Sequence, residues 1–369
     1  MNLDIQDPVP ETFTPIIHAC ITHPIIHLAS SQDVSTIEPQ QVEVVRRDNP
    51  TQAYMVIPSM GEENLDHHAD GWGHVVYGVC LPRLHDDDSE TFQAPSVEQA
   101  TYVAIKRLSK PVVQASLARG INENPYKEIS RMQELGDNHH VLSCIEALED
   151  EEFLYIIMPY CEQGSLAGLI PWSYGFQEDK ARAIFIQLLE NLKYLHSHNI
   201  CHRDMSPDNC MVYNNRIVFV DLAMSFRIPE SGWVSPLGGF GKPPYMAPEL
   251  YFGQPFWGRA CDTWSIAVIL FNMLTGHMLC SIPMPSDLKF RYLVLAQGIS
   301  RNSLNEQTIE LLMNEDDTEE RRELLHIIQK CLGLSVEAQD LLQGSLTMDR
   351  TNRWTSDHME YSPWLAGSE

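Results

Sequence analysis

The sequence predicts an α+β chain of two lobes, because a strand-rich first part precedes a helix-rich second part. Short β-branched and aromatic runs fill the first part, and longer stretches with apolar residues at helical spacing fill the second. The chain has 369 residues, of which 44% are hydrophobic, so it can bury a substantial core without disulfide bonds. We therefore expect a small lobe dominated by an antiparallel β-sheet, a larger and mostly helical lobe, and a cleft between them.

Strands are expected from residue 52 onward. Residues 1–51 carry proline, glutamine and acidic residues with only short apolar patches, and we expect them to form a partly ordered N-terminal extension. The small lobe is predicted over residues 52–161 and the large lobe over residues 162–366. The expected strands lie around Tyr54–Val56, Val75–Tyr77, Tyr102–Leu108, Val141–Leu148 and Phe153–Met158.

Helices are expected where apolar residues recur at helical spacing. Pro125–Leu135 places Ile129, Met132 and Leu135 on one stripe, which predicts the one main helix of the small lobe. Glu178–His198 has the pattern of a long amphipathic helix, and apolar helices follow from Asp262.

Charge limits the partners that this chain can have. Fifty acidic residues against 25 basic ones give a net charge of −25, which repels nucleic acid and anionic membranes but attracts a basic protein. The longest apolar run, Ile266–Leu274, is too short to span a bilayer. Nine scattered cysteines without a Cys-x-x-Cys pair, after an acidic rather than signal-like start, predict reduced thiols in the cytoplasm or nucleus. Nothing in the sequence predicts an oligomeric state.

A lysine and a glutamate form the first candidate pair. In the strand Val103–Lys106, alternation puts Ala104 and Lys106 on one face. Glu128 lies in the helix that follows, where it could pair with Lys106 and aim the ammonium group at a phosphate. Alone, the tetrapeptide fits any strand that ends in lysine, and Glu128 taken alone is better explained as an exposed helical glutamate.

A loop after the long helix carries the strongest signal. It reads His202-Arg203-Asp204-Met205-Ser206-Pro207-Asp208-Asn209, and Asp221 follows at the end of the next strand. Phosphoryl transfer requires a carboxylate for the attacking hydroxyl and oxygen ligands for a divalent ion. Asp204 is suited to the first role, and Asn209 with Asp221 to the second.

These residues resemble the signature set of the eukaryotic protein kinases. Val103–Lys106, His202–Asn209 and Asp221 are joined by Tyr245–Glu249, which contains Ala-Pro-Glu, and the resemblance covers roughly residues 52–366. It implies a Ser/Thr protein kinase that uses ATP and Mg²⁺ to phosphorylate a protein hydroxyl. It also implies a buried pair of Glu249 with Arg353.

The resemblance further implies which residues bind ATP. Pro159 and Cys161 correspond to the hinge, where Pro159 would offer only its carbonyl and Cys161 would supply the N–H group. Met158 corresponds to the gatekeeper. The implied nucleotide-binding residues are Gly71, Gly73, Val76, Ala104, Lys106, Met158, Pro159, Cys161 and Met211.

The chain departs from the family pattern in three places. Its glycine loop retains only Gly71 and Gly73, and Asp-Phe-Gly is replaced by Asp221-Leu222-Ala223. Ser206 stands where the family has lysine, and Lys242 stands where it has threonine. We hypothesise that the ammonium and hydroxyl groups have exchanged places, so that Lys242 neutralises the migrating phosphoryl group. The alternative is drift in a weakening enzyme.

These departures leave two functions open. The first is an active Ser/Thr kinase, and the second is a pseudokinase that acts as a scaffold with weak or no catalysis. Within the activation segment, residues 221–249, we favour Ser231 and Ser235 over Ser225 as regulatory phosphorylation sites because they lie in the middle of the loop.

Overall fold

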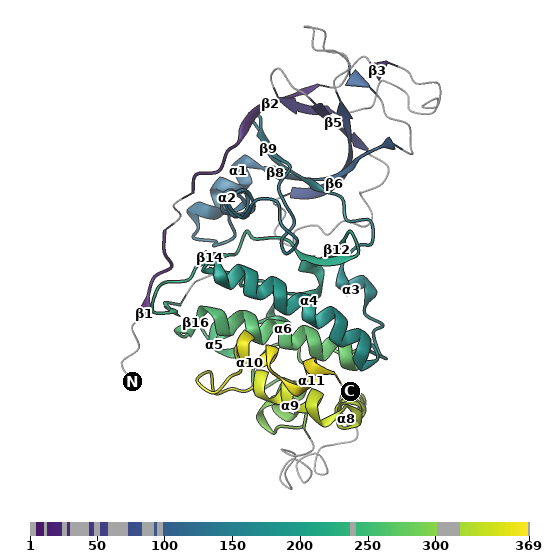
Figure 1. The fold of residues 1–369 in the computed structure, drawn as a ribbon. Helices are drawn as coiled ribbons and strands as arrows, with labels where there is room; N and C mark the ends of the chain where they lie inside the picture. Colours follow the sequence, from purple (N-terminus) through teal and green to yellow (C-terminus); the bar gives the residue numbers. More distant parts are fainter. Residues whose placement is uncertain are drawn as a thin grey trace. The chain divides into compact units, whose positions relative to one another are not determined.

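The computed structural model describes the chain in two units (Figure 1). One, here called the barrel unit, comprises residues 13–138 and 142–162, and the other, the helical unit, comprises residues 1–12, 139–141 and 163–369. The residues described are 5–10, 13–23, 28–29, 44–47, 52–57, 73–82, 92–93, 99–236, 241–300 and 318–367. Gly71 and most of the acidic loop over residues 81–99 lie outside them.

The barrel unit is built on a closed β-barrel with the strand order β10-β8-β6-β5-β4-β2-β9. Neighbouring strands run antiparallel, except that β2 and β9 run parallel. The short strands β3 and β7 form a separate parallel pair. The strands of this unit are β2 (His18–His23), β3 (Leu28–Ala29), β4 (Val44–Arg47), β5 (Gln52–Ile57), β6 (Gly73–Pro82), β7 (Phe92–Gln93), β8 (Tyr102–Ser109), β9 (Glu146–Glu149) and β10 (Phe153–Pro159).

One buried cluster joins strands from all around the barrel. It includes Val45, Tyr54 and Ile105, each with almost no exposed surface. At its edge the hydroxyl of Tyr54 donates a hydrogen bond to Glu146 Oε2 over 2.7 Å, which satisfies a carboxylate that the fold has buried. The alternation that predicted strand Tyr102–Leu108 is therefore also the pattern that fills this core.

The strands of the barrel begin before residue 52, the predicted start of the domain. β2 and β4 lie within residues 1–51, yet they complete the barrel between β9 and β5. A closed barrel has no unpaired edge strand, because β2 and β4 pair with each other and with β9 and β5. These backbone pairings account for the strand conformation of two short segments that were not predicted as strands. Another difference is that the first of the two later strands begins at Glu146 rather than near Val141.

Among its described residues, the barrel unit has two helices, α1 (Lys110–Ala118) and α2 (Pro125–Leu135). The side chain of Asn124 accepts a hydrogen bond from the Tyr126 N–H group and so caps the start of α2, with Pro125 in the first helical position. Gly136 ends the helix with a positive φ of 65°. The predicted bounds of this helix are confirmed, whereas α1 was not expected.

The helical unit contains most of the helices and several short strands (Figure 1). Its helices are α3 (Leu166–Leu169), α4 (Glu178–Ser197), α5 (Pro248–Tyr251), α6 (Gly258–Thr275), α8 (Glu319–Gly333), α9 (Val336–Ser345), α10 (Ser356–Glu360) and α11 (Pro363–Ala366), with a π-helical turn at Phe290–Leu295 and single turns of 3-10 helix at Pro207–Asn209 and Pro243–Tyr245. Its strands are β1 (Ile5–Gln6), β11 (Ile200–Cys201), β12 (Cys210–Tyr213), β13 (Arg216–Phe219), β14 (Phe226–Arg227), β15 (Trp233–Val234) and β16 (Phe256–Trp257).

α6 forms the centre of the helical unit. Nearly all of its side chains are buried, including Asp262 and Trp264, as expected for a helix that is apolar all round. α4 packs against it, and Leu188, Leu192 and Leu195 are among the residues that α4 buries. Full burial of one such leucine stabilises the fold by about 1.5–3 kcal/mol. Among the residues described, no helix is both long and apolar enough to cross a membrane.

Candidate active site

The barrel unit forms the predicted lysine–glutamate pair. Lys106 Nζ on β8 lies 2.8 Å from Glu128 Oε2 on α2, and both side chains are almost fully buried. Two charges withdrawn from water are stabilised only when each has its partner, and removal of one leaves an uncompensated charge. The pair therefore holds the Lys106 ammonium group in one position.

The predicted adenine-binding residues of the barrel unit lie on adjacent strands. Met158 on β10 is opposite Ala104 on β8, and Val76 on β6 is opposite Ile105. Pro159 ends β10, and Cys161 is 4% exposed just beyond it. Burial raises the pKa of the Cys161 thiol to about 12, so this cysteine is neutral at ordinary pH.

Gly73 begins β6, and its lack of a side chain has a structural reason. An added Cβ atom would lie 2.0 Å from the carbonyl oxygen of Arg107 on β8. Only glycine allows the two backbones to approach this closely. The pairing of β6 with β8 accounts for glycine at this position, independently of a contact with phosphate.

In the helical unit, the catalytic-loop candidate connects β11 to β12 and is held by Asp262 of α6. Its carboxylate accepts hydrogen bonds from the backbone N–H groups of His202, over 2.9 Å, and Arg203, over 2.8 Å. His196 Nε2 lies 3.0 Å from the same carboxylate. Burial alone would raise the pKa of Asp262, but the hydrogen bond from His196 and nearby positive charge lower it below its ordinary value. Arg203 has a φ of 70°, a strained conformation that these bonds to Asp262 help to maintain.

Asp204 is oriented by two neighbours. Asn209 Nδ2 donates to the Asp204 carbonyl over 2.7 Å and to its Oδ2 over 3.1 Å, and the Lys242 N–H group donates to Oδ1 over 3.0 Å. Burial and the charge of Asp221 raise the pKa of Asp204, while His202 and Lys242 lower it in part. The result is a carboxylate with a fixed direction and a raised proton affinity.

Asp221 and Asn209 offer the donor atoms that a magnesium ion prefers. A carboxylate and an amide oxygen are both hard ligands, and the effect of Asp221 on the pKa of Asp204 shows that negative charge accumulates here. Asp221 has a φ of 62°, uncommon for a residue other than glycine. Leu222, in the place of phenylalanine, is fully buried. The residues present therefore fit a divalent cation.

Lys242 and Ser206 are brought together as the exchange hypothesis requires. Lys242 Nζ lies 3.2 Å from Ser206 Oγ and 2.7 Å from Asp208 Oδ2. Ser206 is fully buried, whereas the Lys242 side chain is 42% exposed. The lysine thus spans from a buried hydroxyl to a solvent-facing carboxylate, next to the loop that carries Asp204.

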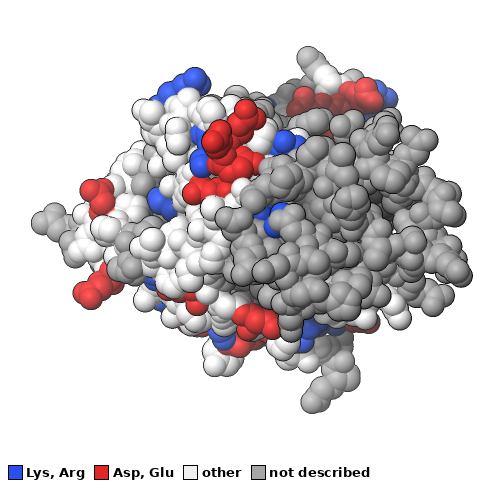
Figure 2. Space-filling view, turned by 90° about the horizontal axis from the view of Figure 1, so that it is seen from above, with Lys and Arg blue, Asp and Glu red and all other residues white. Residues whose placement is uncertain are grey.

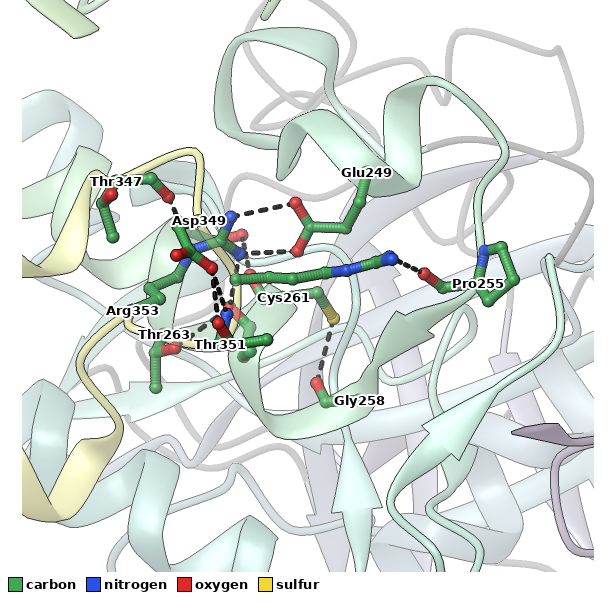
Figure 3. Close-up of polar contacts among 12 residues, drawn as sticks. Glu249, Pro255, Gly258, Cys261, Thr263, Thr347, Asp349, Thr351 and Arg353 are labelled. Carbon is green, nitrogen blue, oxygen red and sulfur yellow. Dashed lines mark hydrogen bonds and ion pairs between the residues drawn. The ribbon is translucent and has the colours of Figure 1, made fainter. Parts of the chain in front are cut away.

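The implied pair of Glu249 with Arg353 is present and bidentate (Figure 3). Its two hydrogen bonds measure 2.6 and 2.9 Å, and both residues are buried. The Arg353 guanidinium group also lies over the Trp264 ring, 4.9 Å from its centre. This pair fixes α5, which ends the activation segment, to the chain before α10.

The serines of the activation segment differ in accessibility. Ser225 is buried and donates to the Leu222 carbonyl, whereas Ser231 and Ser235 are partly exposed. Residues 237–240 lie outside those described. The remaining member of the predicted nucleotide-binding set, Met211, lies on β12 opposite Val218 of β13.

Three features were not foreseen from the sequence. Asp262 was noted as the start of a helix but not as the acceptor that holds the catalytic loop. Gly241 lies so close to the loop that an added Cβ would be 2.8 Å from Asp204 Oδ1. β1 pairs with the activation segment. Gly241 and Asp262 both had a sequence signal, Gly241 in its place just before Lys242 and Asp262 in its place at the expected start of a helix.

The family assignment follows from a match to the model of the protein kinase domain over residues 87–365. This chain belongs to the protein kinase family. Its bilobal α+β class, predicted from the sequence, is confirmed by that match and by the strand-rich and helix-rich units. The predicted start of the domain at residue 52 stays a prediction.

Several protein kinases are similar to part of the chain. Sperm motility kinase 2B of Mus musculus is 33% identical over 207 residues, which cover 56% of this chain and 40% of that protein. Probable serine/threonine-protein kinase HSL1 of Saccharomyces cerevisiae is 34% identical over 161 residues, 42% of this chain and 10% of that protein. Serine/threonine-protein kinase kin-29 of Caenorhabditis briggsae is 26% identical over 234 residues, 62% of this chain and 24% of that protein. The chain therefore spans less than half the length of these relatives.

Proposed function

We propose that this kinase domain is an active Ser/Thr protein kinase that transfers the γ-phosphate of ATP to a protein hydroxyl. The single observation that supports this best is the fixing of Asp204 by Asn209 and by the Lys242 backbone, over 2.7–3.1 Å. A carboxylate held from two sides is preorganised to orient an attacking hydroxyl.

In the proposed mechanism, Asp204 accepts a hydrogen bond from the substrate hydroxyl and then takes its proton as the oxygen attacks phosphorus. Its raised pKa improves it as a proton acceptor, because a base with a pKa closer to the working pH retains the proton more readily. Asp262 acts as a positioning residue through the backbone of the loop.

ATP is expected to be bound by the hinge residues Pro159 and Cys161 and by the Lys106 ammonium group, with Val76, Ala104, Met158 and Met211 against the base. Asn209 and Asp221 would hold Mg²⁺, which when bound neutralises phosphate charge. Lys242 would supply positive charge next to Asp204, the role that the family assigns to the lysine missing at position 206.

The test is transfer of radiolabelled phosphate from ATP with magnesium to a generic basic protein, chosen because the chain carries a net charge of −25. Asp204→Asn keeps the shape of the side chain but removes the base, and should lower the rate about 10²–10⁴-fold. Asp179→Asn is the matched control, because Asp179 is 92% exposed at the start of α4. Equal rates for Asp204→Asn and the wild type would contradict the proposal.

A pseudokinase scaffold is the second candidate, favoured by Ser206, by Ala223 and by the reduced glycine loop. Thermal unfolding with and without Mg-ATP separates the two. A rise in Tm without any transfer to protein identifies an ATP-binding scaffold, and no rise with no transfer identifies one that binds no nucleotide. For either function we propose a cytoplasmic or nuclear location.

A further inference from the structure

The first residues of the chain lie against the activation segment within the helical unit (Figure 1). β1 pairs in parallel with β15, with Ile5 opposite Trp233 and Gln6 opposite Val234. The Ser235 N–H group donates to the Gln6 carbonyl over 2.9 Å. β15 pairs on its other side with β16, so β1 is the outer strand of a three-stranded sheet.

The contact continues along the chain to a second strand of the same segment. The Val9 N–H group donates to the Arg227 carbonyl on β14 over 3.2 Å. β14 in turn pairs with β11, the strand that leads directly into His202. Residues 5–9 therefore bond to both strands of the activation segment that the structure describes.

The local sequence of this segment favours an extended conformation. Val9 stands between Pro8 and Pro10, and Asp7 also precedes a proline. A residue before proline is biased toward the extended region, so the segment loses less conformational freedom than an ordinary chain when it joins a sheet. The prolines also lack the N–H groups that would let another strand add to this edge.

The attachment depends mainly on the main chain. Ile5 is 41% exposed and Val9 39%, so their side chains bury little apolar surface. Val9 also lines a cavity of about 690 Å³ together with Arg227, Ser231 and Trp257. The side chain of Val9 therefore leaves this cavity unfilled. Main-chain hydrogen bonds with little side-chain burial give a contact that can form and release.

We propose that residues 5–9 are a cis-acting regulatory strand that orders the activation segment, the function that a loop phosphate serves in many kinases. The activation segment bears on catalysis through Lys242, whose N–H group holds Asp204 Oδ1. Release of β1 loosens the segment and, through it, the hold on Asp204. The catalytic part of this inference rests on the proposed kinase function, while its structural part does not.

The experiment is amide hydrogen exchange of the full chain at single-residue resolution. The Ser235 amide reports on the contact with Gln6, and the Gly276 amide, which donates to the Asn272 carbonyl at the end of α6, reports on a part of the helical unit away from β1. Val9→Pro removes the N–H donor but keeps an extended backbone. We expect it to speed exchange at Ser235 about tenfold or more and to leave Gly276 unchanged.

The matched control is Asp7→Pro, two residues away in the same segment. Asp7 makes no hydrogen bond in the described part of the structure, so Ser235 should exchange as in the wild type. Deletion of residues 1–10 should reproduce the effect of Val9→Pro, and a synthetic peptide of residues 1–12 at millimolar concentration should reverse it, since a tethered strand acts at about that effective concentration.

The inference is overturned if Ser235 exchanges at the wild-type rate in both Val9→Pro and the deletion, or if Asp7→Pro has the same effect as Val9→Pro. If the Gly276 amide also exchanges faster in the deletion variant, the deletion has destabilised more than the activation segment. The comparison of Val9→Pro with Asp7→Pro then decides. Phosphate transfer should fall in the variants that loosen Ser235. If the wild-type protein transfers no phosphate, the proposed kinase function is contradicted. The hydrogen-exchange result for β1 does not depend on that outcome.

Discussion

Lys242 Nζ lies 3.2 Å from Ser206 Oγ, so two residues that depart from the kinase pattern at separate positions in the sequence are in direct contact. The same ammonium group lies 2.7 Å from Asp208 Oδ2. The fold itself brings these two positions together, so an exchange of positive charge and a drift of both residues give the same contact, and a rate measurement separates them.

A double-mutant cycle tests this exchange. Lys242→Thr should lower the rate of phosphate transfer about 10²–10³-fold, the usual effect of removing one electrostatic contact with the transition state. Ser206→Lys alone should also lower the rate, because it sets two ammonium groups side by side. The double variant restores the arrangement of the family, so its rate should exceed the product of the two single effects. A rate equal to that product would mean that the two positions act independently.

The pair of Lys106 with Glu128 should make a large contribution to the stability of the barrel unit. Lys106→Met removes the ammonium group that faces the buried Glu128 carboxylate, and should lower the free energy of unfolding by about 3–5 kcal/mol. Adding Glu128→Leu removes the buried negative charge and should recover most of the loss. Urea unfolding measures both, with Glu190→Gln as a control, since Glu190 pairs with Arg216 at the surface and should change stability by less than about 0.5 kcal/mol. No recovery in the double variant would show that the lysine stabilises by packing alone.

Asp262 should make stability depend on pH. Its pKa is lower in the folded chain than in the unfolded one, so its contribution is present above the unfolded pKa, about 3.9, and is lost as the pH falls through the folded value. Asp262→Asn cannot titrate and places an N–H₂ group against backbone donors. The difference in unfolding free energy between wild type and Asp262→Asn should therefore be largest near neutral pH and shrink below about pH 4. A constant difference across this range would show that the Asp262 charge is not the stabilising feature.

Cys161, which lies just after β10 in the predicted hinge, should be unreactive. Burial raises its pKa to about 12, so its thiolate fraction near neutral pH is about a thousandfold below that of an ordinary cysteine. Iodoacetamide labelling followed by mass spectrometry should modify Cys161 much more slowly than a cysteine in an unfolded control, with a rate that rises as the pH is raised. Rapid labelling at neutral pH would contradict the burial of this thiol.

The sequence predicted those parts of the site whose residues are close together in the chain or belong to a recurring set. The loop from His202 to Asn209 and the helix with Glu128 are short segments with clear patterns. The contact of Lys242 with Ser206 was predicted from the positions that these two residues occupy in the family pattern, and not from the geometry of the chain. Asp262 was missed as a positioning residue because an acidic residue at the start of a helix usually has a capping role, and only the fold shows that it faces the loop.

The strands β1, β2 and β4 could not be predicted for a different reason. Each is short. β1 and β2 have partners far away in the sequence, such as Trp233 for Ile5 and Leu148 for His18, and β4 lies between β2 and β5. Local preference is weak in such segments, so tertiary pairing decides their conformation. The acidic, proline-containing composition of residues 1–51 predicted a partly ordered extension. Composition alone does not indicate which strands these residues pair with.

The closed barrel sets the length of the shortest fragment that retains all of its strands. A polypeptide trimmed to the start of the family match, at residue 87, would lack four of the barrel strands, β2, β4, β5 and β6, and would leave the Lys106 strand exposed along one side. Trimming to residue 52 would keep β5 and β6 but would open the ring between β5 and β9. A fragment meant to keep the barrel closed therefore needs the residues from β2 onward.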